Sequence, residues 1–140
     1  MTTSDIGQRL LLASARLVRQ ARLSAPSGLT SSQTSALGSL SRLGPIRVSD
    51  LAQVEGVALP VMTRLVASLE ELELVAKTAS ETDKRSVLVE LTDTGRAKIK
   101  DLIEQQSGIV AAKLASLSPD EIGRLESALE ALEKLGSQNR

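Results

Sequence analysis

The side chains that could do chemistry in this sequence are charged and hydroxyl groups, because its 140 residues include no His and no Cys. Without these two residues there is no imidazole general base, thiolate nucleophile, zinc-finger ligation or disulfide bond. The sequence also offers no phosphate-binding glycine loop and no recognisable acid–base pair or metal-ligand cluster. We therefore expect that the protein is not an enzyme and that it holds no cofactor and no metal.

Nucleic acid is a possible partner, but only in some forms. The sequence contains no Phe, Tyr or Trp, so it cannot build the stacking platforms that bind single-stranded nucleic acid. Binding to duplex DNA needs no stacking platform, so duplex DNA remains a possible partner. Because 17 basic residues balance 17 acidic ones, binding to DNA must come from local clusters of basic residues and not from the net charge.

Lys84 and Arg85 form one such cluster, within the polar segment ASETDKRS. This segment separates two β-compatible runs, residues 74–78 and 87–91, and the second run places Val87, Val89 and Leu91 on one side. The pattern predicts a β-hairpin. Its polar tip would carry both basic side chains at the place furthest from the core.

A helix-turn-helix pattern directly precedes this hairpin. The stretch RVSDLAQVEGVALPVMTRLVASLEELELV contains a short helix, a turn at residues 55–57 and a longer helix from about residue 59 to 72. Ala52 is small enough for two helices to cross closely, and Gly56 suits the tight turn. A hairpin that follows a helix-turn-helix is a wing, which gives the motif a second contact with DNA.

Four further helices are expected around this motif. The first ends before residue 25, the second runs from a cap at Thr30 to about Leu43, and the last two start at caps Thr92 and Ser118. The first helix and the last two have apolar stripes that the winged unit is too small to cover within one subunit. We therefore expect a homodimer built from both chain ends.

Together these patterns predict a mainly α fold with a small β-hairpin wing, a winged helix-turn-helix domain plus terminal dimerisation helices. Residues 1–28 would be the N-terminal dimerisation helix, residues 29–92 the DNA-binding unit and residues 93–140 the C-terminal dimerisation helices, in one compact domain overall. No apolar run is long enough to span a membrane, and the start lacks the order of a signal peptide. We expect a cytoplasmic protein with no membrane partner.

The order of these elements is similar to that of the MarR family of transcriptional regulators. Over about residues 29–135 the resemblance rests on LTSSQTSALGSL, GPIRVSDLA, VMTRLVASLEELELV, TDKRSVLVELTDTGR and LSPDE. The wing segment is the most specific. It resembles the family pattern of an Asp, any residue and an Arg, then an apolar strand ending in Leu-Thr and a Gly three residues later: Asp83, Arg85, Leu91, Thr92 and Gly95.

The resemblance implies that recognition helices enter successive major grooves of a pseudo-palindromic site, while the wing-tip Arg enters the minor groove. Carried over by position, Lys84 and Arg85 lie at the wing tip, and Asp83 orients Arg85. Glu73 stands where the family usually has a Gly that closes the recognition helix. The outward face of that helix would consist of Pro60, Val61, Thr63, Arg64 and Ser68.

The function that the resemblance implies is a ligand-responsive repressor that binds double-stranded DNA as a homodimer. In this family, small anionic or phenolic effectors often bind between the winged unit and the dimer helices. The sequence does not identify the effector of this protein, so the ligand-binding residues are unknown. Without Cys or His, direct thiol oxidation and His-dependent zinc sensing are excluded.

A second hypothesis is a winged-helix protein-interaction module that has lost DNA binding. The balanced charge and the few base-reading groups on the recognition helix favour this alternative. The two hypotheses differ in whether Arg64 and Arg85 contact a duplex.

Overall fold

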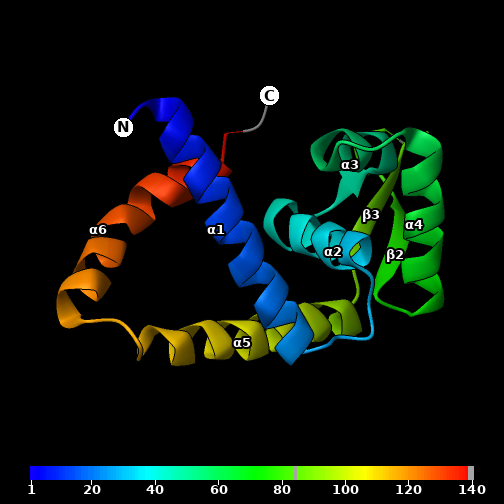
Figure 1. Ribbon diagram of the computed structural model, residues 1–140. Helices are drawn as coiled ribbons and strands as arrows, with labels where there is room; N and C mark the ends of the chain where they lie inside the picture. Colours follow the sequence, from blue (N-terminus) through cyan, green and yellow to red (C-terminus); the bar gives the residue numbers. More distant parts are fainter. Residues whose placement is uncertain (84, 139–140) are drawn as a thin grey trace. The chain divides into compact units, whose positions relative to one another are not determined.

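The computed structural model describes residues 1–83 and 85–138, which form six α-helices and three β-strands (Figure 1). Helices dominate and the sheet is small, so the expected mainly α fold with a wing is confirmed. In chain order the elements are α1 (Thr3–Ser24), α2 (Ser31–Leu43), β1 (Ile46–Arg47), α3 (Val48–Glu55), α4 (Leu59–Glu71), β2 (Val75–Ala79), β3 (Val87–Leu91), α5 (Asp93–Leu114) and α6 (Pro119–Gly136).

The chain divides into two compact units. The winged unit is Gly28–Ile103, which contains α2, α3, α4, the sheet and the first half of α5. The terminal unit combines Met1–Ser27 with the chain from Glu104 onward, and it contains α1, the second half of α5 and α6. The assignment of residues 1–28, 29–92 and 93–140 to dimerisation, DNA binding and dimerisation stays a prediction.

The core of the winged unit is built from aliphatic side chains and one Met. Helices α2, α3 and α4 each turn one apolar stripe inward, and the sheet and the start of α5 complete the cluster. Burial of this kind stabilises by about 25 cal/mol per Å² of apolar surface removed from water. The largest fully buried side chains are Leu37, Leu40, Leu51, Met62, Val66, Leu69 and Val89.

The sheet has three strands in the order β1-β3-β2, all antiparallel. β2 and β3 form the expected hairpin, with Val75 opposite Leu91 and Ala79 opposite Val87. β1 is an additional strand of two residues, and it pairs Arg47 with Leu88. This pairing attaches the start of α3 to the wing.

Capping boxes define three helix starts. Thr30 accepts a hydrogen bond from the N–H of Gln33, whose side chain accepts from the N–H of Thr30 in return, and Ser118 and Glu121 do the same at α6. These two starts were expected. α1 has a third capping box, at Thr2 and Asp5. A cap of this type contributes about 1 kcal/mol to stability. The capping side chains therefore fix the residue at which each helix begins.

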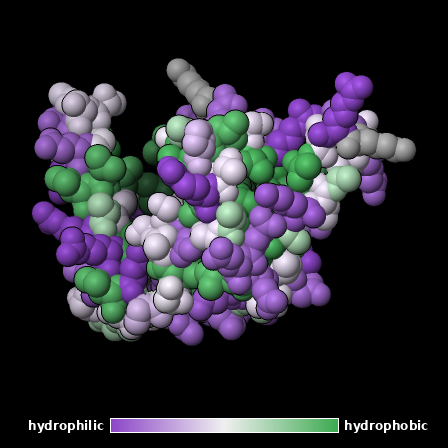
Figure 2. Space-filling model, turned by 90° about the vertical axis from the view of Figure 1, so that its right-hand side faces the viewer, coloured by the Kyte–Doolittle hydropathy of each residue, from purple (hydrophilic) through white to green (hydrophobic). Residues whose placement is uncertain are grey.

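The helices of the terminal unit expose many apolar side chains. Every residue of α6 is at least partly exposed. Figure 2 faces the winged unit, and there too hydrophobic residues lie at the surface among hydrophilic ones. Within the described residues, no helix is long and apolar enough to cross a membrane. The most exposed leucines of α1 and α6 are Leu11 (69%), Leu23 (70%), Leu129 (51%) and Leu135 (57%).

Candidate nucleic-acid interface

The turn between α3 and α4 is closed by main-chain hydrogen bonds. Gly56 ends α3 with a φ of 67°, in the left-handed region that favours glycine. Its N–H donates to the carbonyls of Ala52 and Gln53, and the N–H of Val57 donates to the carbonyl of Ala52 at 3.0 Å. Ala52 itself is buried, as expected where two helices cross. The turn thus fixes the direction of α4.

α4 has a buried face and an exposed face. Its buried residues pack into the core of the winged unit, so the helix cannot rotate about its axis without exposing them. Four of the five residues expected on the outward face of the recognition helix are exposed: Pro60, Val61, Thr63 and Arg64. The structure therefore brings these four together on one side of α4.

Arg64 is the basic side chain of this face. Within the described part of the chain, its guanidinium makes no hydrogen bond or ion pair. Thr63, in contrast, donates its hydroxyl to the carbonyl of Leu59 at 2.9 Å. Arg64 consequently keeps all of its donors for an outside acceptor, and a guanidinium can bind two acceptors of a guanine at once.

Ser68 differs from the other four residues. It is half-buried, its hydroxyl donates to the carbonyl of Leu65 at 2.6 Å, and it accepts from the side-chain amide of Gln33 at 3.2 Å. Gln33 belongs to α2, so Ser68 connects the recognition helix to the helix behind it. The structure does not place Ser68 on the exposed face, and its contact with DNA stays untested.

The wing tip is held by Asp83. Its carboxylate accepts from the main-chain N–H of Arg85 and from the hydroxyl of Ser86, each at 3.0 Å. The hydrogen bond from the Arg85 N–H, and then that from Ser86, hold the pKa of the Asp83 carboxyl below its ordinary value. Asp83 thus acts on Arg85 through the main chain. Arg85 is exposed, and Lys84 lies outside the described residues.

The base of the wing tip is closed by Ser80. Its N–H donates to the carbonyl of Ser86 at 2.9 Å, and its buried hydroxyl lies 3.1 Å from that of Thr82. The N–H of Asp83 donates to the same Ser80 hydroxyl at 3.4 Å. These hydrogen bonds continue the β2–β3 ladder into the turn and attach Thr82, Asp83 and Ser86 to a paired strand end.

Arg47 is a residue at this site that the sequence did not indicate. It is exposed at the end of β1, beside β3, and its positive charge contributes to lowering the pKa of Asp83. It is also the N-cap residue of α3 and makes no capping hydrogen bond from its side chain. Only the pairing of β1 with β3 brings Arg47 to the wing, and a two-residue strand leaves no periodic signal in a sequence.

The wing is anchored to α5 by Thr92 and Gly95. The Thr92 hydroxyl donates to the carbonyl of Glu73 at 2.6 Å and accepts from the N–H of Gly95 at 2.9 Å. A Cβ on Gly95 would overlap the carbonyl oxygen of Leu74 and lie 2.9 Å from its carbon. The Leu-Thr and Gly pattern of the wing segment therefore has a physical reason: α5 begins in direct contact with the main chain of Leu74, the residue before β2.

Glu73 has a positive φ of 60°, directly after α4. A left-handed conformation costs about 1–2 kcal/mol for a residue with a Cβ, and this explains why a Gly is expected at that position. The N–H of Glu73 donates to the carbonyl of Glu70 at 2.9 Å, which closes the end of the helix. The chain makes this turn without the glycine.

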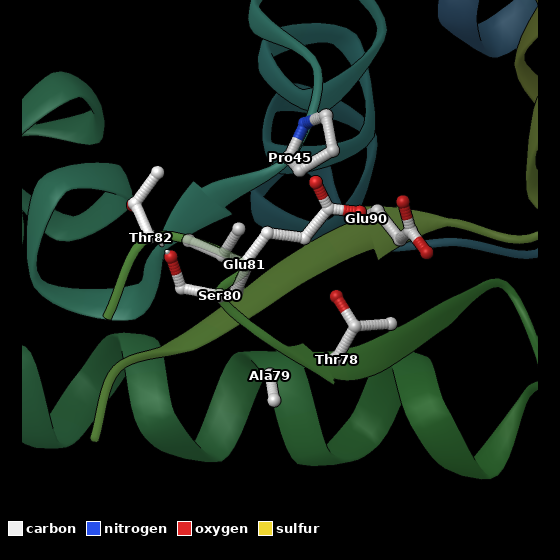
Figure 3. Close-up of a pocket in the computed structure, with 8 residues that line it drawn as sticks. Pro45, Thr78, Ala79, Ser80, Glu81, Thr82 and Glu90 are labelled. Atoms are coloured by element: carbon white, nitrogen blue, oxygen red, sulfur yellow. Dashed lines mark hydrogen bonds between the residues drawn. The ribbon is translucent and has the colours of Figure 1, made fainter. Parts of the chain in front are cut away.

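A cavity of about 460 Å³ opens beside the wing. Figure 3 shows Glu81 reaching across it toward Pro45 and Glu90. Two carboxylates make this wall acidic, so it repels the phosphate backbone. This cavity is therefore not a surface that favours DNA. The cavity is lined by Pro45, Thr78, Ala79, Ser80, Glu81, Thr82, Leu88 and Glu90.

A helix-turn-helix with an exposed second helix and a wing with a basic tip define a winged-helix protein of the class that binds duplex DNA. Comparison with known proteins agrees: the MarR family model matches residues 29–87. The HTH-type transcriptional regulator Mb0904 of Mycobacterium bovis is 36% identical over 135 residues, which cover 94% of each chain. The chain belongs to the MarR family of transcriptional regulators.

Two further similarities extend this result. The HTH-type transcriptional repressor MdtR of Bacillus subtilis is 30% identical over 95 residues, covering 68% of this chain and 61% of that protein. The crystal structure of RV1404 from Mycobacterium tuberculosis matches 100% of this chain and 98% of its own, with a TM-score of 0.84 and 26% identity. Regulators of this family bind DNA and function as dimers, and they are not enzymes.

Proposed function

We propose that this protein is a sequence-specific regulator that binds a pseudo-palindromic operator in double-stranded DNA as a homodimer. The observation that carries the proposal is that one unit presents two separate exposed elements, the outward face of α4 with Arg64 and the wing tip with Arg85. Two such elements match the two grooves that a winged helix contacts.

Each element has a distinct task in this proposal. Arg64 binds a guanine in the major groove, with Pro60, Val61 and Thr63 beside it on the same face. The wing tip, with Arg85 and Lys84, enters the minor groove, where a narrow groove strengthens the attraction to a guanidinium. Asp83 keeps the tip in shape, and Ser68 supports α4 from behind through Gln33.

The terminal unit supplies the dimer interface in this proposal. α1 and α6 expose leucines that are 39–70% accessible, among them Leu11, Leu125 and Leu135. Large exposed apolar surfaces mark interaction sites. A second copy of the chain would cover them and would also set the spacing between the two recognition helices.

The regulatory role is repression that a small-molecule effector relieves, in the cytoplasm. The support for repression is that the relative MdtR is a repressor by name. The sequence has no Cys and no His, so thiol and imidazole sensors are excluded, and what remains is a small molecule, a protein partner or no effector at all. The effector itself is unidentified.

Selection from random duplexes tests the proposal. We expect enrichment of two inverted half-sites about 10 base pairs apart, centre to centre. Binding of the selected duplex should weaken as salt rises, because Arg and Lys displace counterions from the phosphates. Arg64→Ala and Arg85→Ala should each cost about 1–3 kcal/mol in binding. Arg124→Ala, which removes an Arg paired with Asp120 on α6, is the matched control and should change little.

The alternative function is a protein-interaction module without DNA binding. The formal net charge of zero favours it, since most DNA-binding domains are basic. The same selection separates the two functions. If no duplex is enriched, and affinity purification gives one stoichiometric protein partner, the alternative replaces the proposal.

A further inference from the structure

Three apolar side chains are exposed where α4 begins. Val57 is 38% exposed, Leu59 is 50% exposed and Val61 is 43% exposed. We call Val57, Leu59 and Val61 the apolar tip. Further along α4, Met62, Val66 and Leu69 are fully covered and Leu65 is half-buried, so the large apolar side chains there face the core. The apolar tip is therefore the part of the recognition helix whose hydrophobic surface is left to a partner.

Hydrogen-bonding side chains are scarce around the apolar tip. Ala58, the N-cap residue, gives no side-chain hydrogen bond, and Pro60 has no N–H to donate. The hydroxyl of Thr63 already donates to the carbonyl of Leu59. Within residues 57–64, all of which are described, Arg64 is the one charged side chain. This end of α4 cannot distinguish bases mainly through hydrogen bonds.

The residues at the N-terminus of a recognition helix are those that contact base edges. In the major groove the one apolar group on any base edge is the C5-methyl of thymine. Burial of an apolar group against another is favourable, by about 0.8 kcal/mol per methyl-sized group. The apolar tip and the thymine methyl are thus complementary in chemistry.

The spacing along α4 allows this contact beside that of Arg64. Val61 and Arg64 are three residues apart on the exposed face, which is about 4.5 Å along a helix axis. Successive base pairs are about 3.4 Å apart. An Arg64 that binds a guanine would therefore leave Val61 next to a neighbouring base pair.

We propose that the apolar tip reads thymine methyl groups, so that each half-site contains thymines next to the guanine bound by Arg64. This inference rests on the proposed DNA-binding function and adds the kind of base that the protein selects. Specificity then comes from methyl contacts more than from hydrogen bonds to bases.

Replacing thymine by uracil tests the inference, since uracil keeps the base pair and lacks only the methyl. The duplex enriched by selection is made with uracil at each half-site thymine in turn, and the dissociation constant of the full-length protein is measured. At the contacted positions we expect a loss of affinity of about fourfold per methyl. Uracil outside the half-sites should change nothing.

Two protein variants assign the effect to the apolar tip. Leu59→Ala and Val61→Ala should bind the thymine duplex more weakly than the unmodified protein does, and should no longer distinguish it from the uracil duplex. Leu72→Ala is the matched control, because Leu72 follows the other end of α4 with a similar exposure of 49%. It should keep the full preference for thymine.

The outcomes separate this inference from the proposed function. If a duplex is enriched and uracil is tolerated at every position, the apolar tip does not read methyl groups, and DNA binding stands. An equal loss of preference in Leu72→Ala overturns the inference in the same way. If no duplex is enriched at all, the inference and the proposed function both fail.

Discussion

Asp83 shapes the wing tip while lying fully at the surface. We predict that its carboxyl titrates below the ordinary value of 3.8, because hydrogen bonds from Arg85 and Ser86 favour the carboxylate. Their contribution to stability is complete above the unfolded pKa and is lost as the pH falls through the lower folded pKa. An NMR titration of the Arg85 amide, from neutral pH downward, measures the midpoint.

Arg47 provides the comparison for this titration. Arg47→Ala should move the midpoint upward, because it removes a positive charge that favours the ionised Asp83. Arg124→Ala, on α6, should leave the midpoint where it was. A midpoint at or above 3.8 in the unmodified protein would show that the hydrogen bonds to Asp83 do not persist in solution.

Gly95 is required by the contact between α5 and Leu74, the residue before β2. Gly95→Ala would force a Cβ onto the main chain of Leu74, and we predict a loss of about 3 kcal/mol in the free energy of unfolding. Gly108→Ala is the control on the same helix, since nothing lies within 4 Å of its added Cβ. That variant should gain about 1 kcal/mol from better helix propensity. Denaturant unfolding of both variants measures these two changes in the free energy of unfolding.

At the scale of secondary-structure elements, the buried residues of α4 hold it in the core, and a side-chain hydrogen bond adds a second link, to α2. Ser68→Ala removes the hydrogen bond between Ser68 and Gln33, which we expect to cost about 1 kcal/mol relative to a matched control. Ser127→Ala is that control, because the Ser127 hydroxyl bonds only within α6, to the carbonyl of Gly123. Thermal unfolding of the two variants measures the difference.

The same Ser68 variant also tests the site. We expect the folded Ser68→Ala protein to bind its selected duplex about as well as the unmodified protein does, since the residue is half-buried. A large loss of DNA affinity without a change in stability would show that Ser68 contacts DNA, as the resemblance to the family implies.

Most elements could be predicted from the sequence because their signals are local. The caps at Thr30 and Ser118 and the alternating residues of 87–91 each act within a few positions of the chain, and the structure has the helices and the strand there. β1 could not be predicted. It exists because residues 46–47 pair with a strand 40 positions later, and two residues are too few for a period.

The candidate site was also predictable only in part. The resemblance to the MarR family implies that Pro60, Val61, Thr63 and Arg64 lie on the outward face of the recognition helix, and all four are exposed. The sequence could not show that Ser68 meets Gln33, or that Arg47 lies near Asp83, because both depend on packing between elements distant in the chain.

At the scale of the whole molecule, the exposed leucines of the terminal unit predict how it assembles. Leu129 is 51% exposed on α6, so Leu129→Glu should leave the fold of one chain intact and place a charge in the interface between two copies. We expect monomers in sedimentation analysis, unchanged helicity by circular dichroism, and a strong loss of affinity for a two-half-site duplex.

Leu72→Glu is the matched control for this assembly test. Leu72 has a similar exposure of 49% but belongs to the winged unit, so this variant should stay dimeric. Dimers that persist in Leu129→Glu at unchanged affinity would place the interface elsewhere.

The core of aliphatic side chains and Met has an optical consequence. Because the chain contains no aromatic residue, the protein has no side-chain absorption or fluorescence in the near ultraviolet. Any near-ultraviolet absorption or fluorescence of a complex therefore comes from the other component. A single Trp would be a fluorophore without background. Val87→Trp, at a position 48% exposed on β3 next to the wing tip, should report the arrival of a duplex by a change in emission intensity.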